Sequence, residues 1–184
     1  MLYAAEIAVN PWDAASLVFT ESQYLCPTER SARWLVDASA VSNKSVFVYQ
    51  LVYEPGVMAL VGDIFYWYQW CPDLLPCSNM SMPFGVTHAS DIPLVWSKNL
   101  LNATDRAVAA AVNDYWQNFG AYGNPNGHIP AVAPASSRLG LMQGEASGLR
   151  WPEYADGSTT MRLNITSTPA TGVSGGRCAF WDRQ

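Results

Sequence analysis

Charged residues are scarce in this sequence of 184 residues. Asp, Glu, Lys and Arg make up 14% of it, against roughly 25% in an ordinary soluble domain. The basic residues form no cluster and the net charge is −5. Nucleic acid is therefore not an expected partner, because phosphate binding needs grouped Lys and Arg. A surface this poor in charge is either covered or kept soluble by something other than charge.

Long hydrophobic runs are missing as well. The aromatic-rich stretch 64–70 is far shorter than the ~20 residues that a membrane-spanning helix needs, so no membrane span is predicted. The N-terminus does not have the pattern of a signal peptide, because Glu6 and Asp13 interrupt its apolar run and no basic residue precedes them.

Four cysteines are present: Cys26, Cys71, Cys77 and Cys178. They allow three pairings if all are bridged. Cys71 and Cys77 enclose a short proline-containing loop that a local disulfide would close, which leaves Cys26 for Cys178. In the chain-entropy model this long closure is worth about 4–5 kcal/mol. The alternative is four reduced, buried thiols in a cytosolic protein. A zinc site is not favoured, because there is no Cys-x-x-Cys and both histidines are far away in sequence.

Glycosylation sequons occur four times, at Asn43, Asn79, Asn102 and Asn164. One sequon is weak support, but four of them beside paired cysteines favour a glycosylated secretory protein. Asn164 falls within an expected strand, which counts against its use.

The first half of the chain predicts helices followed by one strong strand. Residues 4–24 are helix-leaning, and a helix is expected over 28–39. Residues 45–54 are rich in β-branched and aromatic side chains, and apolar residues occupy most positions rather than alternate ones, which is typical of a strand buried on both faces of a parallel sheet. Residues 55–87 form a long loop, and loops of that length inside a domain are usually functional or tied down.

The second half predicts a long helix and a short strand. Thr104 is a plausible N-cap, an apolar stripe runs from Val108 to Tyr122, and Gly123 followed by a proline at 125 ends the helix. Residues 124–150 read as loop and 151–154 as an ordered return. Residues 159–165 alternate as an edge strand, with Met161, Leu163 and Ile165 on one face, and 178–181 is a small anchoring segment.

Two histidines are candidates for proton transfer. His88 follows the long loop and is flanked by apolar residues that can anchor it, which suits a general base. His128 reads as a solvated loop residue. No Gly-x-Ser-x-Gly precedes either of them in the chain, and in the string 144–148 the serine comes one place too late for a nucleophile elbow. Judged by itself, a lone loop histidine is more often structural than catalytic.

Several strings agree in order with one family. They are Tyr24-Leu25-Cys26-Pro27, the strand at 46–53, Gly85-Val86-x-His88-x-x-Asp91-Ile92-x-Leu94-Val95, Trp116-x-Asn118-Phe119-x-x-Tyr122-Gly123-Asn124-Pro125-Asn126, Trp151-Pro152 with Tyr154, and Cys178-x-Phe180-Trp181. In these the chain resembles the C-terminal third of type-B carboxylesterases and cholinesterase-like proteins, which are α/β-hydrolases. The strings span residues 24–181, while 55–84 is longer than in cholinesterases.

The resemblance implies a partial α/β-hydrolase fold: a buried central strand, a long loop carrying the histidine, a long helix and a short edge strand. Position by position, His88 matches the family's catalytic histidine and Asp91 a supporting acidic position. Cys26 and Cys178 match a disulfide pair, and Asn102 matches a position that is often glycosylated. The substrate would be a small-molecule ester, and no cofactor or metal is implied.

The family's serine and its triad acid precede the histidine in sequence. Residues 1–184 are therefore expected to be the C-terminal part of one carboxylesterase domain, with Met1 an internal methionine and the signal peptide upstream of it. A secreted serine esterase is the main expectation. The alternative is a non-catalytic cholinesterase-like adhesion or binding module, against which the intact His88 argues. A freestanding domain is a third possibility.

Overall fold

The computed structural model describes residues 2–42, 44–58, 86–127, 149–155 and 158–183. The chain divides into two compact units. The first unit comprises Met1–Val48, Pro152–Met161 and Pro169–Gln184, and the second comprises Tyr49–Trp151 and Arg162–Thr168. Several predictions fall outside the described residues: Asn43, Asn79, Cys71, Cys77, His128, the aromatic stretch 64–70, and nearly all of the loops at 55–87 and 124–150.

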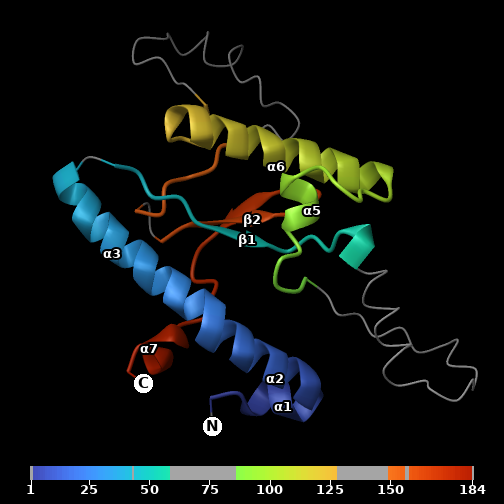
Figure 1. Ribbon diagram of the computed structural model, residues 1–184. Helices are drawn as coiled ribbons and strands as arrows, with labels where there is room; N and C mark the ends of the chain where they lie inside the picture. The colour runs from blue at the N-terminus through green and yellow to red at the C-terminus, as the bar shows by residue number, and fades with distance from the viewer. Residues whose placement is uncertain (1, 43, 59–85, 128–148, 156–157, 184) are drawn as a thin grey trace, which may run out of the picture. The chain divides into compact units, whose positions relative to one another are not determined.

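Helices dominate the first unit. They are α1 (Ala4–Val9), α2 (Pro11–Thr20), the π-helical turn η1 (Glu21–Leu25), α3 (Cys26–Ser42) and α7 (Cys178–Trp181) (Figure 1). The side chain of Asn10 caps α2 by accepting from Trp12 N–H at 3.0 Å. The predicted helical character of 4–24 is confirmed. Helix α3 is longer than the predicted 28–39, since it begins at Cys26, directly after η1, and continues to Ser42.

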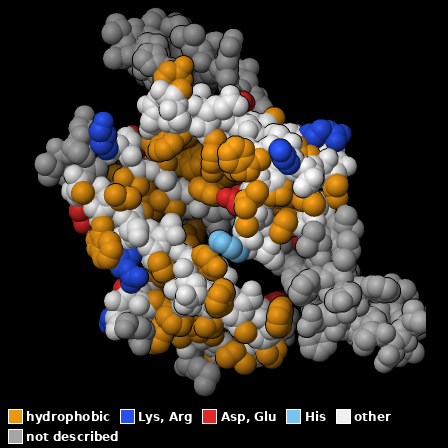
Figure 2. All heavy atoms as spheres, in the orientation of Figure 1, with side chains coloured by type: hydrophobic (Ala, Val, Ile, Leu, Met, Phe, Trp, Pro, Cys, Tyr) orange, Lys and Arg blue, Asp and Glu red, His pale blue; other side chains and the backbone are white. Residues whose placement is uncertain are grey.

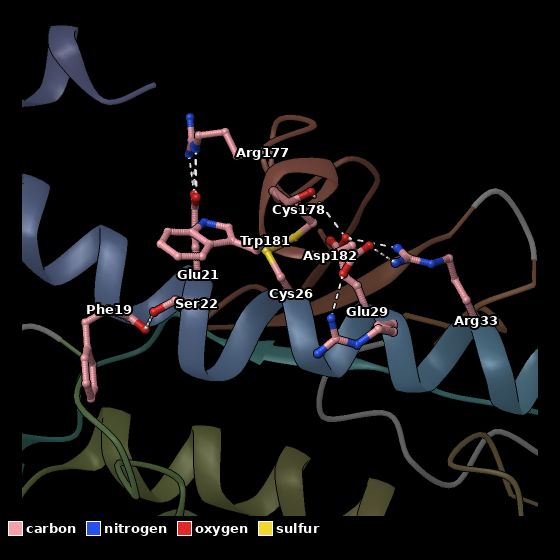
Figure 3. The surroundings of a disulfide bond; sticks show 12 residues. Phe19, Glu21, Ser22, Cys26, Glu29, Arg33, Arg177, Cys178, Trp181 and Asp182 are labelled. Carbon is pink, nitrogen blue, oxygen red and sulfur yellow. Dashed lines mark hydrogen bonds and ion pairs between the residues drawn. A yellow bond between two sulfur atoms is a disulfide. The ribbon is translucent and has the colours of Figure 1, made fainter. Parts of the chain in front are cut away.

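A disulfide joins α3 to the C-terminal helix. Cys26 and Cys178, 152 residues apart, are bonded, which confirms that pairing (Figure 3). Beside it the fully buried carboxylate of Glu21 accepts from Arg177 Nε at 2.8 Å and from the Tyr3 hydroxyl at 2.6 Å. The 178–181 segment is therefore the predicted anchor, because covalent and ionic contacts fasten it to the N-terminal helices.

A small core closes the first unit. Ala32, Val48 and Tyr154 are buried together, with Val36 and Val46 packed against them. The backbone N–H of Tyr154 donates to the carbonyl of Val46 at 2.8 Å, so the predicted ordered return of the chain near 151–154 is confirmed.

The described strands form one three-stranded sheet, in the order β1 (Tyr49–Leu51), β2 (Thr160–Leu163), β3 (Thr168–Ala170). Met161 N–H donates to the Val48 carbonyl and Val52 N–H to the Leu163 carbonyl. Residue numbers therefore rise together along β1 and β2, as in a parallel pair.

Two strand predictions are wrong in extent or position. The strand expected over 45–54 with both faces buried is only three residues long, and its first residue, Tyr49, is exposed. The segment expected at an edge is instead central, since β2 lies between β1 and β3. Met161 and Leu163 are buried as predicted, but Ile165 lies beyond the strand and is 68% exposed.

The second unit contains the helices α5 (Ile92–Val95) and α6 (Ala103–Tyr122), which pack against each other (Figure 1). The N-cap of α6 is Asn102 rather than the predicted Thr104, because Asn102 Oδ1 accepts from Asp105 N–H at 2.7 Å. The helix ends as predicted at Gly123, whose φ of +67° favours glycine. The predicted apolar stripe is buried at Val108, Val112 and Tyr115, while Phe119 and Tyr122 are at least half exposed.

The described residues contain no helix long and apolar enough to cross a membrane. Side chains on the face drawn in Figure 2 are mostly apolar, with charged ones scattered among them, in keeping with the low charge content of the sequence.

Candidate active site around His88

His88 lies on a tight turn with its side chain exposed to solvent (pale blue in Figure 2). Ser90 N–H donates to the Thr87 carbonyl and Ile92 N–H to the Ala89 carbonyl, each at 3.1 Å. Ala89 has a φ of +69°, a conformation that costs a non-glycine residue roughly 1–2 kcal/mol. The residue after the histidine is thus held in a strained conformation by the turn around it.

Asp91 ties this turn to strand β1. Its Oδ2 accepts a hydrogen bond from the Tyr49 hydroxyl at 2.9 Å. Asp91 occupies the N-cap position of α5, but its side chain makes no capping hydrogen bond there. The side chain of Asp91 therefore links the turn to β1 and does not cap α5.

Aromatic side chains position Tyr49 for this contact. Its ring packs edge to face against Trp116 of α6, with centroids 5.0 Å apart, and against Trp151, at 6.1 Å. Partial burial, then the hydrogen bond to Asp91 and the charge of that carboxylate, raise the pKa of Tyr49. The phenol therefore stays protonated and remains the donor. The hydrogen bond between Tyr49 and Asp91 was not predicted, because the two residues are 42 positions apart and no sequence motif links them.

Helix α5 holds the turn from its other side. Leu94 is fully buried, and Asn113 of α6 donates from Nδ2 to the Leu94 carbonyl at 3.0 Å and to Ser97 Oγ at 2.9 Å. The helix that directly follows His88 is thus fastened to the longest helix of the unit. His88 is presented on a short exposed turn with fixed supports on both sides.

Comparison with protein families identifies the chain. The model of the carboxylesterase family matches residues 7–181, which is nearly the whole sequence. The chain belongs to the carboxylesterase family. Comparison with curated proteins finds no match.

Membership of the carboxylesterase family has two consequences. It implies the α/β-hydrolase fold, of which the described residues form helices and a three-stranded sheet. It also places the chain among esterase-type hydrolases, for which the substrates are esters. The resemblance to type-B carboxylesterases and cholinesterases is confirmed at the level of the family.

A second carboxylate of this carboxylesterase chain, Asp105, shapes the path of the backbone that leaves β1. It is fully buried and accepts hydrogen bonds from the Tyr53 hydroxyl at 2.7 Å, from Gly56 N–H at 3.0 Å and from Leu101 N–H at 2.9 Å. Burial opposes ionisation of Asp105, but these bonds and the one with the Asn102 backbone outweigh it and lower its pKa. Burial and the same carboxylate raise the pKa of Tyr53 to about 12.

Gly56 belongs to this arrangement for a steric reason. A Cβ at that position would lie 3.0 Å from Asp105 Oδ2, a contact so tight that the carboxylate would have to shift by a few tenths of an ångström. By sequence, Asp105 could be assigned only to the first turn of a helix. The glycine and the aspartate are 49 residues apart, and no local pattern indicated that they would meet.

The serine nearest to His88 in sequence is not in a nucleophile elbow. Ser90 is nearby in sequence, but it is buried and its hydroxyl bonds to Thr87 Oγ1 at 3.1 Å. In the described part of the chain no three His, Cys, Asp or Glu side chains group so that they could hold a metal ion. The arrangement offers one exposed imidazole on a braced turn, which can accept and release a proton.

Proposed function

We propose that this chain is the C-terminal segment of a secreted serine carboxylic ester hydrolase, and that His88 is its general base and acid. One observation carries the proposal: the imidazole is exposed on a turn held by Asp91–Tyr49 on one side and by α5 on α6 on the other. A base must be presented to substrate and must also be kept in place. In a chain of the carboxylesterase family, this combination fits the histidine of a catalytic triad.

The chemistry assigned to His88 consists of two proton transfers. In acylation the imidazole takes the proton of a serine hydroxyl while that oxygen attacks the ester carbonyl. It then gives the proton to the departing alkoxide, which leaves as the alcohol. In deacylation the same imidazole takes a proton from water and returns it to the serine. No net proton remains on the histidine after one turnover.

The serine and the acid of the triad are assigned to polypeptide outside this sequence. Residues 172–176 have the Gly-x-Ser-x-Gly pattern, but they follow His88, whereas in α/β-hydrolases the serine and the acid precede the histidine in the chain. Ser174 of this string is also buried, and its hydroxyl donates to Glu29 Oε2 at 3.3 Å. Asp91 is not the triad acid in this proposal. Its carboxylate is engaged by Tyr49, and its role is to hold the turn so that the imidazole keeps its orientation.

Secretion is the second part of the proposal. The Cys26–Cys178 disulfide supports it, because such bonds persist in oxidising compartments and are rare in the cytosol. The sequons at Asn102 and Asn164 are exposed at the surface, as acceptors of glycans must be.

The test begins with the transcript that encodes this chain. We expect an in-frame Gly-x-Ser-x-Gly upstream of Met1. The protein translated from that longer frame should hydrolyse a chromogenic ester such as a p-nitrophenyl acylate and react with a fluorophosphonate serine probe. His88→Gln should lower kcat/KM by about 10²–10⁴-fold, while Asp114→Asn, a control change at a half-buried carboxylate on α6, should leave it unchanged.

Two results would contradict the proposal. A longer frame in which the serine is replaced would favour the binding module over the esterase. Full activity of the His88→Gln protein would show that another group transfers the proton.

A further inference from the structure

A modification site lies where strand β2 ends. The strand stops at Leu163, so Asn164 does not lie within it as the sequence had predicted. Asn164, Ile165 and Thr166 are all exposed, and the chain returns to the interior at Ser167. The whole Asn-x-Thr sequon therefore stands in one exposed turn after the strand.

The hydrogen bonds of this turn direct the Asn164 amide outward. Asn164 Oδ1 accepts from the neighbouring Ile165 N–H at 2.8 Å. The Asn164 backbone N–H meets Ser167 Oγ at 3.4 Å. Among the described residues no hydrogen bond uses Asn164 Nδ2, the atom to which a sugar would be attached. The carbonyl end of the side chain is fixed, and its nitrogen is left available.

Asn102, the other described sequon, is built differently. Its Oδ1 caps α6 at 2.7 Å from Asp105 N–H, and its Nδ2 lies 3.1 Å from where a Cβ on Gly56 would be. The nitrogen of Asn102 therefore faces neighbouring backbone, while that of Asn164 does not. The folded chain can therefore accommodate a glycan on Asn164 without loss of a hydrogen bond, although the place of this sequon in an expected strand had counted against it.

We propose that Asn164 carries an N-linked glycan. The acceptor is its Nδ2, which forms the bond to the anomeric carbon of N-acetylglucosamine as the lipid diphosphate leaves the transferred oligosaccharide and the nitrogen loses one proton. A glycan at this position adjoins Ile165, an apolar side chain that is 68% exposed. It also supplies polar surface to a chain with few charges. This inference rests on the secretory location proposed above.

The experiment is translation of residues 1–184 behind a heterologous signal sequence in the presence of ER microsomes. Glycans are counted by the gel shift that endoglycosidase removes, and the site is identified by mass spectrometry of the peptide containing residue 164. We expect this peptide to be modified. Asn164→Gln and Thr166→Ala should each lose one glycan, while the matched control Thr166→Ser, which keeps the sequon, should retain it.

An unmodified Asn164 in the wild-type chain, or an unchanged glycan count in Asn164→Gln, would overturn the inference. The added signal sequence delivers the chain to the lumen, and transfer occurs as the chain enters. A negative result would therefore concern this site alone. It would not bear on the natural route of the protein or on the esterase role of His88, which the ester assay tests separately.

Discussion

Replacing Asp105 by Asn should loosen the backbone that connects β1 to the segment beyond Tyr53. The substitution keeps the shape of the side chain but turns one carboxylate oxygen into an amide that donates. Asp105 Oδ1 accepts from two donors, Tyr53 O–H and Gly56 N–H, and Oδ2 accepts from Leu101 N–H. Whichever oxygen is replaced, at least one buried donor then faces another donor.

The size of the loss follows from these contacts. A hydrogen bond to a charged group contributes about 1.5–3 kcal/mol, and a buried donor left without a partner costs about 1–3 kcal/mol. The remaining bonds also weaken when the acceptor becomes neutral. We expect Asp105→Asn to lower the free energy of unfolding by about 3 kcal/mol. Asp114→Asn is the matched control, since within the described residues no hydrogen bond uses that carboxylate, and such surface changes fall within about 0.5 kcal/mol.

The effect should depend on pH in a defined direction. The pKa of Asp105 is lowered from its ordinary value of 3.8 in the folded chain. The stabilisation it provides is therefore fully present above that value, and it is lost as the pH falls through the lowered folded pKa. The difference between wild type and Asp105→Asn should shrink under strongly acidic conditions.

Urea unfolding followed by tryptophan fluorescence measures the global effect, and amide hydrogen exchange at Gly56 and Leu101 measures the local one. Both amides donate to Asp105, so both should exchange faster in the variant. Unchanged protection of these two amides, together with an unfolding midpoint like that of Asp114→Asn, would refute the reasoning.

Two further variants test the hydrogen bond between Tyr49 and Asp91 and the Cys26–Cys178 disulfide. Tyr49→Phe keeps the ring and removes the hydrogen bond to Asp91, which should cost about 1 kcal/mol and speed exchange of the Ser90 amide in the His88 turn. Unaltered Ser90 exchange would mean that the bond does not hold the turn. The double variant Cys26→Ser/Cys178→Ser should lose about 5 kcal/mol in urea unfolding, from the entropy of the opened loop, and reduction of the wild type should have the same effect. A loss near zero would contradict the chain-entropy account.

Local patterns predicted the parts of this fold that have local causes. The end of α6 was predictable because Gly123 can adopt a positive φ and a proline soon follows it. Burial of Met161 and Leu163 followed from alternation along a strand. The family strings around His88 were sufficient to name it as the candidate residue, and the Cys26–Cys178 pair followed by elimination and by resemblance.

Contacts between distant residues were beyond the reach of these patterns. The length of β1 and the central place of β2 depend on which strand lies beside which, and Ile165 is exposed because β2 ends before it. Thr104 was expected as the N-cap of α6, and only the folded backbone showed that Asn102 is the cap instead.

The sequence alone determined that this is a carboxylesterase-family chain with one histidine in the family's motif and cysteines able to join its ends, because such features depend on residue identity and order. Only the tertiary structure showed that Tyr49 donates a hydrogen bond to Asp91, that Asp105 accepts one from the backbone of Gly56, and that Asn164 is exposed to solvent. Hydrogen bonds and exposure depend on distances in space, and segments separated by tens of residues acquire those distances when the chain folds.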